Sequence, residues 1–332
     1  MAKTVPSRAF GDRRNGQLRR AHRDPFSIHH RRQDGLDGRA GGQRRVMPTG
    51  LKDAGALEAE VRMTRSVHSG AILIVEGPDD ARFWGGLVDT GACELVIAEG
   101  KVNATGAITR LDNSGFAGAL ALVDDDRDSL LGRGPLSDNL IRTDAHDLEC
   151  VLLRSPALGR VLAELGDDAK LTRFVQTSGK PVRAALLDKG CLFGRVWWAA
   201  ELIGHPIEHG IRQVQRYVRQ QDWEIDEQQF WAAVVSGAQE PAAAGLRDAA
   251  AALPDADPWF VARGHDLVAI LRIGLKRALG NIRNSVGPAR ISQLLRVAFQ
   301  LEDLDACELG KRIREWEWRT QGFAILAADP FG

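Results

Sequence analysis

Five acidic side chains in the first half of the chain are the residues most able to carry out chemistry, and each lies at or shortly after the end of a predicted strand. They are Glu76, Asp80, Asp124, Asp126 and Glu149. Ligands of a parallel α/β sheet bind at the carboxyl ends of its strands, so we expect these side chains to converge on one edge. Their mutual repulsion would be costly without a cation between them. Because the set contains only oxygen ligands, with no His or Cys, it predicts Mg²⁺ or Mn²⁺ rather than zinc.

Two such ions a few Å apart can activate a water molecule and stabilise the leaving oxygen of a phosphodiester. Glu76 follows one strand, and Asp124 and Asp126 follow another, so these three are the strongest candidates for catalytic residues and metal ligands. An Asp at a strand end or a helix start is also a common cap. Asp80 and Glu149 are therefore open to both interpretations, as ligands or as capping residues.

An alternation of strands and helices in the first half of the chain must position these carboxylates. Short apolar runs predict buried strands at 71–75, 94–98, 118–123 and 139–142. Helical spacing and a Pro suited to a first helical turn predict helices at 51–68, from Pro78 onward and at 102–111. This alternation predicts an α/β fold with a mostly parallel, Rossmann-like sheet of four strands.

The second half of the chain has a different pattern. From His146 onward, apolar residues recur with the period of a helix, as at 183–204 and 291–299. We find no second strand-rich region in this sequence. The pattern predicts an α/β domain over residues 47–155, followed by an all-α domain over residues 156–332.

Lys101 and Asn103 begin the helix after the second predicted strand, near the same edge of the sheet. This position predicts either a phosphate contact with nucleic acid or ordinary capping. For Asp125, which lies between Asp124 and Asp126, and for Asp128, which follows them two residues later, a structural role is favoured. The chain contains no GxxxxGK[ST] phosphate loop, so it does not hydrolyse ATP by that route and any ATPase must be a partner.

The phrases ILIVEGPDD at 72–80 and LALVDDD at 120–126 resemble the Toprim domain of topoisomerases, primases and OLD-type nucleases. The hallmarks of that domain are a Glu-Gly after the first strand and a D-x-D after the third. EGKVNATGAITRL at 99–111 and TDAHDLECVLL at 143–153 resemble a Toprim group found in bacterial phage-defence loci, some of whose members work beside an ABC-type ATPase. The resemblance covers residues 71–155 and, loosely, the helical remainder.

The resemblance implies a role for each of the five carboxylates. Glu76 matches the Toprim glutamate, which acts as a general acid or base and as a metal ligand. Asp124 and Asp126 match the metal ligands of the D-x-D motif. Asp80 matches a further acid used by OLD-type nucleases, and Glu149 fits the acid that the defence-linked group places after the fourth strand.

Two departures from the Toprim pattern disfavour a topoisomerase or a primase. The glycine usual soon after D-x-D is missing, and Arg-Asp-Ser stands at 127–129. The only tyrosine, Tyr217, lies in the helical part. Gly-His-Asp at 264–266 opens a long amphipathic helix and has counterparts in the defence-linked group, although a lone His at a helix start is typical of capping or packing.

The leading hypothesis is an Mg-dependent endonuclease that hydrolyses phosphodiester bonds of DNA or RNA, in anti-phage defence with a partner ATPase. A haloacid-dehalogenase-like phosphatase also places D-x-D after a strand, but it favours Thr or Val where Asp128 stands and leaves Glu76 without a role. A degenerate Toprim module that binds or scaffolds is the non-enzyme alternative, and the retained Glu76 and D-x-D motif disfavour it. The choice of DNA or RNA and the oligomeric state stay open.

Composition places limits on the class of protein. Of 332 residues, 44% are hydrophobic and 27% are charged, as in globular proteins. No apolar stretch approaches the roughly 20 residues that a membrane-spanning helix needs. The cysteines are far apart and form no CxxC pair, which excludes a zinc ribbon or a disulfide scaffold and fits a reducing, cytoplasmic compartment. They are Cys93, Cys150, Cys191 and Cys307.

The net charge of zero conceals an uneven distribution. Residues 1–46 contain twelve basic and four acidic residues, a net charge of +8, and the remaining 286 residues contain 32 basic and 40 acidic residues, a net charge of −8. A body of that sign would need a local basic groove or bound cations to meet a polyanion. Residues 1–46 have no apolar period and are predicted to be disordered. They favour a start at Met47 over a nucleic-acid-binding arm.

Overall fold

The computed structural model describes residues 52–205, 207–208, 210–237 and 242–327. The predictions for residues 1–46 and for a start at Met47 lie outside these residues.

Four parallel strands form a single sheet in the order β2-β1-β3-β4. They are β1 (Ala71–Val75), β2 (Cys93–Ile97), β3 (Ala119–Val123) and β4 (Leu140–Arg142). The predicted α/β fold with a parallel sheet is thus confirmed, with the starts of β2, β3 and β4 displaced by one residue from the predicted ones. Because β2 lies on one side of β1 and β3 on the other, the strand order reverses between β1 and β3. Such a reversal creates the crevice in which α/β proteins bind ligands.

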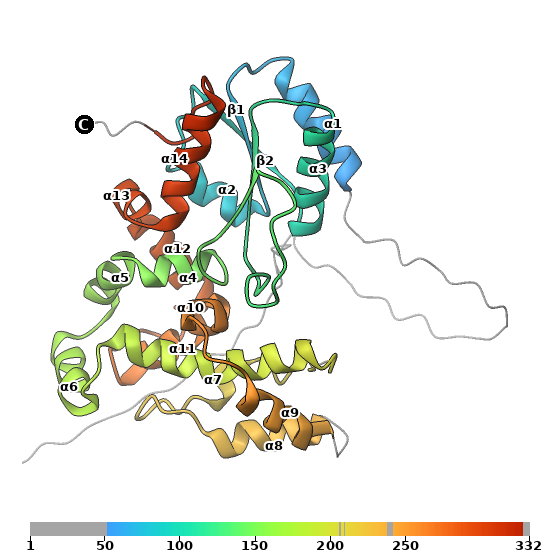
Figure 1. Cartoon of the computed structure of the whole chain (residues 1–332). Coiled ribbons are helices and arrows are strands. Elements are labelled where there is room, and N and C mark those ends of the chain that lie inside the picture. The colour runs from blue at the N-terminus through green and yellow to red at the C-terminus, as the bar shows by residue number, and fades with distance from the viewer. Residues whose placement is uncertain (1–51, 206, 209, 238–241, 328–332) are drawn as a thin grey trace, which may run out of the picture. The chain divides into compact units, whose positions relative to one another are not determined.

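Helices cover both faces of the sheet (Figure 1). On one face, Ile72 and Ile74 of β1 pack in a common core with α1 (Ala54–Arg65) and α3 (Lys101–Asn113). On the other face, Leu73 and Val75 belong to a core that includes α2 (Pro78–Trp84) and the later helices. Alternate residues of β1 therefore point into different cores, and all five are buried. A strand buried on both faces explains why its sequence is uniformly apolar.

The rest of the described chain is helical, apart from isolated bridges, as predicted. After β4 come α4 (Leu148–Arg154), α5 (Ala157–Leu165), α6 (Asp168–Ser178), α7 (Val182–Leu202), the 3₁₀ helix η1 (Val214–Tyr217), α8 (Glu227–Gly237), α9 (Ala242–Ala252), α10 (Pro258–Val261), α11 (Gly264–Arg277), α12 (Pro288–Ala298), α13 (Leu301–Asp305) and α14 (Glu308–Thr320). None of the helices in the described residues is long and apolar enough to cross a membrane.

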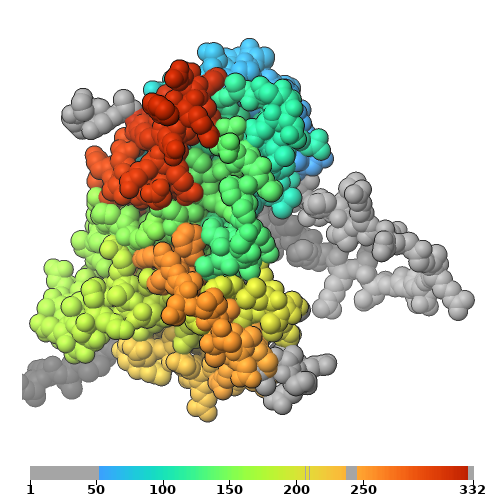
Figure 2. All heavy atoms as spheres, viewed as in Figure 1, coloured from blue at the N-terminus to red at the C-terminus, as the bar shows by residue number. Residues whose placement is uncertain are grey.

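The last helices return to the sheet. α14 packs against the edge strand β4, and Figure 2 shows α13 and α14, in red, against the green residues that include β4. The indole of Trp316 in α14 donates a hydrogen bond to Asn139 Oδ1 over 2.8 Å. Beyond α14, Leu326 forms a bridge with Val88. One hydrophobic cluster runs from the sheet through these helices, so the predicted boundary at residue 155 separates two kinds of secondary structure rather than two cores.

Candidate functional site

Glu76 and Asp124 meet at the point where the strand order reverses. Glu76 directly follows β1 and Asp124 directly follows β3, and these strands are hydrogen-bonded neighbours with Val75 opposite Leu122. The backbone N–H of Asp124 donates to Glu76 Oε1 over 2.7 Å. The side chain of Asp124 accepts a further hydrogen bond, at Oδ1, from the N–H of Leu148 in α4 over 3.0 Å. Two strands and one helix therefore hold these two carboxylates in the crevice.

Asp80 joins them from the first turn of α2. Its Oδ2 accepts the N–H of Gly77, the N-cap residue of α2, over 2.9 Å, so the capping interpretation is correct for this oxygen. The same turn brings Asp80 into a small pocket shared with Glu76 and Asp124. Trp84 also lines this pocket, so the carboxylates border apolar surface. Capping and a place in the carboxylate cluster are thus compatible for Asp80.

The environment of this cluster opposes ionisation. Burial raises the pKa of Glu76 to about 7. The hydrogen bond from the N–H of Asp124 lowers this pKa, and the negative charges of Asp126 and Asp80 raise it further. Burial, together with repulsion from Asp147 and Glu76, raises the pKa of Asp124 well above its ordinary range. Burial likewise raises the pKa of Asp80. A bound cation relieves the repulsion in a half-buried group of carboxylates such as this one.

The nearby basic side chains pair with other carboxylates. Arg82 and Arg296 lie 2.5 and 3.6 Å from Asp79, and Lys101 lies 3.3 Å from Asp126. Among the described residues, no Lys, Arg or His nitrogen lies within 4.0 Å of a carboxylate oxygen of the three residues that share the pocket. The donor set therefore fits a hard divalent cation, which accepts oxygen ligands and compensates their charge.

Asp126 lies at the exposed margin of the site. Its side chain is 50% exposed, and Oδ2 faces Lys101 Nζ at 3.3 Å. Asp126 and Arg127 both have left-handed backbones, with φ of 49° and 66°. Residues other than glycine adopt this conformation at a cost, and such strain is frequent at functional sites. The glycine that the Toprim pattern places soon after D-x-D would adopt it freely, and here Arg127 takes it instead.

The two predicted nucleic-acid contacts are engaged within the protein. Lys101 Nζ donates to Asp125 O over 2.9 Å and pairs with Asp128 at 2.8 Å. Asn103 Nδ2 donates to the carbonyls of Lys52 and Ala98, each over 3.0 Å. Asn103 thus ties the start of α3 to the neighbouring loop. The capping interpretation is wrong for this residue, because its amide nitrogen donates to carbonyls and the N-cap of α3 is Gly100, which has no side-chain cap.

Asp125 is fully buried and accepts a hydrogen bond from the hydroxyl of Ser129 over 2.5 Å. Asp128 pairs with Arg133 at 3.0 Å in addition to Lys101. Both residues hold the loop after β3 in place, which agrees with the structural role predicted for them.

Glu149 belongs to an adjoining group with Asp147 and His265. One ligand atom from each of these three residues lies within 4.8 Å of the others, and His265 Nδ1 is 4.0 Å from Glu149 Oε2. Burial and repulsion from Asp147 raise the pKa of Glu149. The charge of Asp147 also raises the pKa of Asp124, so this group lies near the pocket of Glu76. The sequence analysis predicted only Glu149 of these three as a ligand.

Asp147 connects α4 to α11. As the N-cap of α4, its Oδ1 accepts the N–H of Cys150 over 2.9 Å, and its Oδ2 accepts the N–H of Gly264 over 2.8 Å. A Cβ at Gly264 would overlap the Asp147 carboxylate, so glycine is required for this close approach. The contact places His265 beside Glu149. The Gly-His-Asp phrase was therefore the signal that could have revealed His265.

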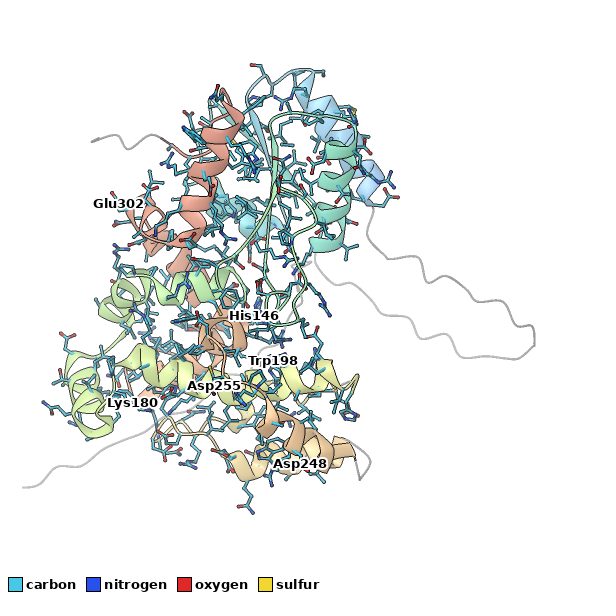
Figure 3. All side chains as sticks on the ribbon, viewed as in Figure 1. His146, Lys180, Trp198, Asp248, Asp255 and Glu302 are labelled. Carbon is cyan, nitrogen blue, oxygen red and sulfur yellow. The ribbon has the colours of Figure 1, made fainter. Side chains whose placement is uncertain are left out.

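His146, labelled in Figure 3, contacts both Arg127 and Asp147 through its two ring nitrogens. Its Nε2 lies 3.0 Å from Arg127 Nη1, and because a guanidinium only donates, Nε2 accepts and the proton resides on Nδ1. Nδ1 lies 3.4 Å from Asp147 Oδ2. Burial alone would raise the pKa of Asp147, but His146 and the N–H donors of Cys150 and Gly264 hold it below its ordinary value.

The structure therefore brings Glu76, Asp80 and Asp124 into one pocket, with Asp126 at its margin and Glu149 in the adjoining group with a histidine. Lys101, Asn103, Asp125 and Asp128 do not line this pocket. Tyr217 is buried in the helical core. Comparison of the chain with protein-family models and with curated proteins gives no match.

Proposed function

We propose that this protein is a metal-dependent nuclease of the Toprim type, which hydrolyses phosphodiester bonds of DNA or RNA. The observation that carries the proposal is the pair formed by Glu76 and Asp124, which are hydrogen-bonded to each other where the strand order reverses, half-buried, and without a basic partner among the described residues. The sequence resemblance to Toprim proteins over residues 71–155 adds the reaction class. A haloacid-dehalogenase-like phosphatase would give no role to Glu76, the residue that binds Asp124.

Mg²⁺ or Mn²⁺ is the cofactor that the donor set supports. Glu76, Asp80 and Asp124 would hold one ion. Asp126, which does not line their pocket but is near enough for its charge to raise the pKa of Glu76, would be a further ligand. Glu149 and His265 would contribute to a second, where an imidazole nitrogen suits Mn²⁺ better than Mg²⁺. When bound, such ions supply a water of lowered pKa and offset the charge of the phosphate.

The residues of the chain would contribute proton transfer and orientation. In the metal-free protein Glu76, with a pKa of about 7, would exchange its proton near neutral pH, and a bound cation would lower that pKa. The role of Glu76 as a general acid or base is therefore what the Toprim resemblance implies. Asp124, anchored by the N–H of Leu148, keeps a fixed geometry beside it. Preorganised groups of this kind need no rearrangement during the reaction.

We further propose that the nuclease acts in the cytoplasm in anti-phage defence with an ABC-type ATPase partner. The support is the resemblance of the phrases at 99–111 and 143–153 to defence-linked Toprim proteins, together with the absence of a GxxxxGK[ST] phosphate loop from the chain. An ATP-dependent trigger would then have to come from the partner.

The test is cleavage of labelled single-stranded DNA, RNA and duplex DNA by the purified protein with Mg²⁺ or Mn²⁺, alone and with any ATPase encoded beside its gene. Glu76→Gln and Asp124→Asn should each eliminate cleavage, and EDTA should do the same to the wild type. Glu94→Gln is a matched control, because Glu94 is an exposed residue of β2 outside the site. Full metal-dependent cleavage by Glu76→Gln would refute the proposed function.

A further inference from the structure

A groove between α2 and α12 combines apolar and basic surface. It has a volume of about 690 Å³. Its apolar lining includes Phe83 of α2 and Phe299 after α12, whose rings pack edge to face at 5.3 Å. Its basic lining consists of the guanidinium groups of Arg82, Arg290 and Arg296. This volume is in the range of sites that bind an organic ligand of several rings, roughly 300–1,000 Å³.

The groove is locally positive on an acidic body. Among the described residues, no Asp or Glu lines it. The carboxylate of Asp79 lies beside it and pairs with Arg82 at 2.5 Å and with Arg296 at 3.6 Å. Three guanidinium groups against one carboxylate leave a net charge of +2. A local basic groove is what a body with a net charge of −8 needs in order to meet a polyanion.

The groove adjoins the carboxylate cluster. α2 carries Asp80 in its first turn, and Arg82 and Phe83 of the same helix line the groove. Burial raises the pKa of both Asp80 and Glu149, and the positive charge of Arg296 opposes that rise in each. Arg296 is therefore near both carboxylates, although its side chain is only 9% exposed. A polymer in the groove would therefore lie along α2, the helix that carries Asp80.

A second basic groove is less suited to this role. Its lining combines five cations, which include Arg212 and Arg263, with three carboxylates that would repel a phosphate, Asp126, Asp128 and Glu201. Lys101 and Arg133 pair with Asp128, and Arg127 pairs with Glu201. Acidic side chains of its own lining thus compensate three of its cations, whereas among the described residues no Asp or Glu lines the α2–α12 groove.

The apolar part of the α2–α12 groove indicates which form of polyanion fits. Val297 lines it with 82% of its surface exposed. The bases of a duplex are stacked inside the helix, whereas a single strand can place its bases on apolar side chains while its phosphates contact cations. Phe83, Leu87 and Phe299 are buried, so Val297 is the apolar side chain of the lining that a base could contact, and its exposed position beside the arginines favours a single strand.

From these observations we propose that the α2–α12 groove binds a single-stranded stretch of nucleic acid, with Arg82 and Arg290 contacting its phosphates, and leads it to the carboxylates at Asp80. The proposal rests on the proposed nuclease function for the identity of the polyanion. It adds the path of the substrate and its single-stranded form.

The experiment measures binding separately from cleavage. The full chain is titrated with labelled oligodeoxythymidylate, oligouridylate and a duplex of equal length, in EDTA and over a series of salt concentrations. The test variant is Arg82→Gln with Arg290→Gln, which leaves the buried Arg296 in place. The control is Arg110→Gln with Arg173→Gln, two exposed arginines on α3 and α6 outside the groove.

We expect the wild type and the control to bind the single strands better than the duplex. The test variant should bind them several-fold more weakly with an unchanged melting temperature. The slope of log affinity against log salt concentration should fall by roughly 1.4, because each phosphate contact of a single strand contributes about 0.7. A wild type that prefers the duplex or binds no strand, or a test variant that binds as the wild type does, would overturn the groove assignment.

Cleavage with Mg²⁺, measured on the same proteins, separates the two proposals. If the test variant loses binding and the wild type does not cleave, the groove stands and the nuclease function fails. If the wild type cleaves and the test variant binds and cleaves equally well, the nuclease function stands and the groove fails.

Discussion

Neutralising Glu76 should stabilise the metal-free protein at alkaline pH. Glu76→Gln keeps the size of the side chain and an oxygen that can accept the N–H of Asp124. It removes a negative charge from a half-buried position near Asp80 and Asp126. Because the wild-type charge lacks a basic partner, its loss should increase the free energy of unfolding, although the same change eliminates the proposed catalytic group.

The magnitude and the pH window follow from the pKa of Glu76. It is raised from 4.5 to about 7 in the folded protein. The protonated group therefore contributes stability that is fully present below pH 4.5 and is lost as the pH rises through about 7. At about 1.36 kcal/mol per pKa unit, this loss is roughly 3 kcal/mol at most. Partial hydration of the site reduces this loss of stability, and we expect Glu76→Gln to increase the free energy of unfolding by about 1–3 kcal/mol at the alkaline end of the range.

The assay is urea unfolding of the wild type and Glu76→Gln in EDTA at several pH values from 5 to 8. The difference in the free energy of unfolding between the two proteins should grow in favour of the variant across this range. Glu94→Gln, at an exposed position of β2, should show a difference that changes little with pH. A variant that becomes less stable relative to the wild type as the pH rises would show that the Glu76 charge is already compensated, and the reasoning about the site would be wrong.

Two further predictions concern the metal ions. In the double variant Asp124→Asn with Asp126→Asn, Mg²⁺ should no longer raise the melting temperature, whereas the wild type should gain about 2.7 kcal/mol of stability at an ion concentration a hundredfold above the Kd; a full response in the double variant would place the metal site elsewhere. His265→Ala should weaken the binding of Mn²⁺ more than that of Mg²⁺ in calorimetric titration, because only the softer ion gains from an imidazole ligand. Equal loss for both ions, or none, would exclude His265 as a ligand.

Local sequence was sufficient to predict the sheet and the carboxylates at its edge. The run 71–75 is apolar without interruption because both of its faces are buried, and such a run predicts a central parallel strand. Polar residues directly after buried strands can only lie at the carboxyl edge of the sheet. Glu76 and Asp124 were therefore predictable as neighbours, although the 2.7 Å hydrogen bond between them was not.

A polar residue in the first turn of a helix can be recognised from the local sequence, but the role of its side chain cannot. Asp80 caps α2 and faces the pocket, whereas Asn103 is engaged entirely by backbone carbonyls. Both are polar residues in the first turn of a helix. Only the packing of the surrounding elements determines which of them borders the carboxylate cluster.

The sequence by itself thus determined the α/β alternation, the parallel sheet and the set of carboxylates that follow its strands, because each depends on residues close together in the chain. The tertiary structure alone decided that α11 supplies His265 to Glu149, 116 residues earlier, and that α12 places Arg296 near Asp80. These contacts depend on which apolar helix faces pack together, and on a glycine at 264 that lets the backbone of α11 approach the Asp147 carboxylate. Helical periodicity shows which face of a helix is buried but not what it packs against, so no local pattern could reveal them.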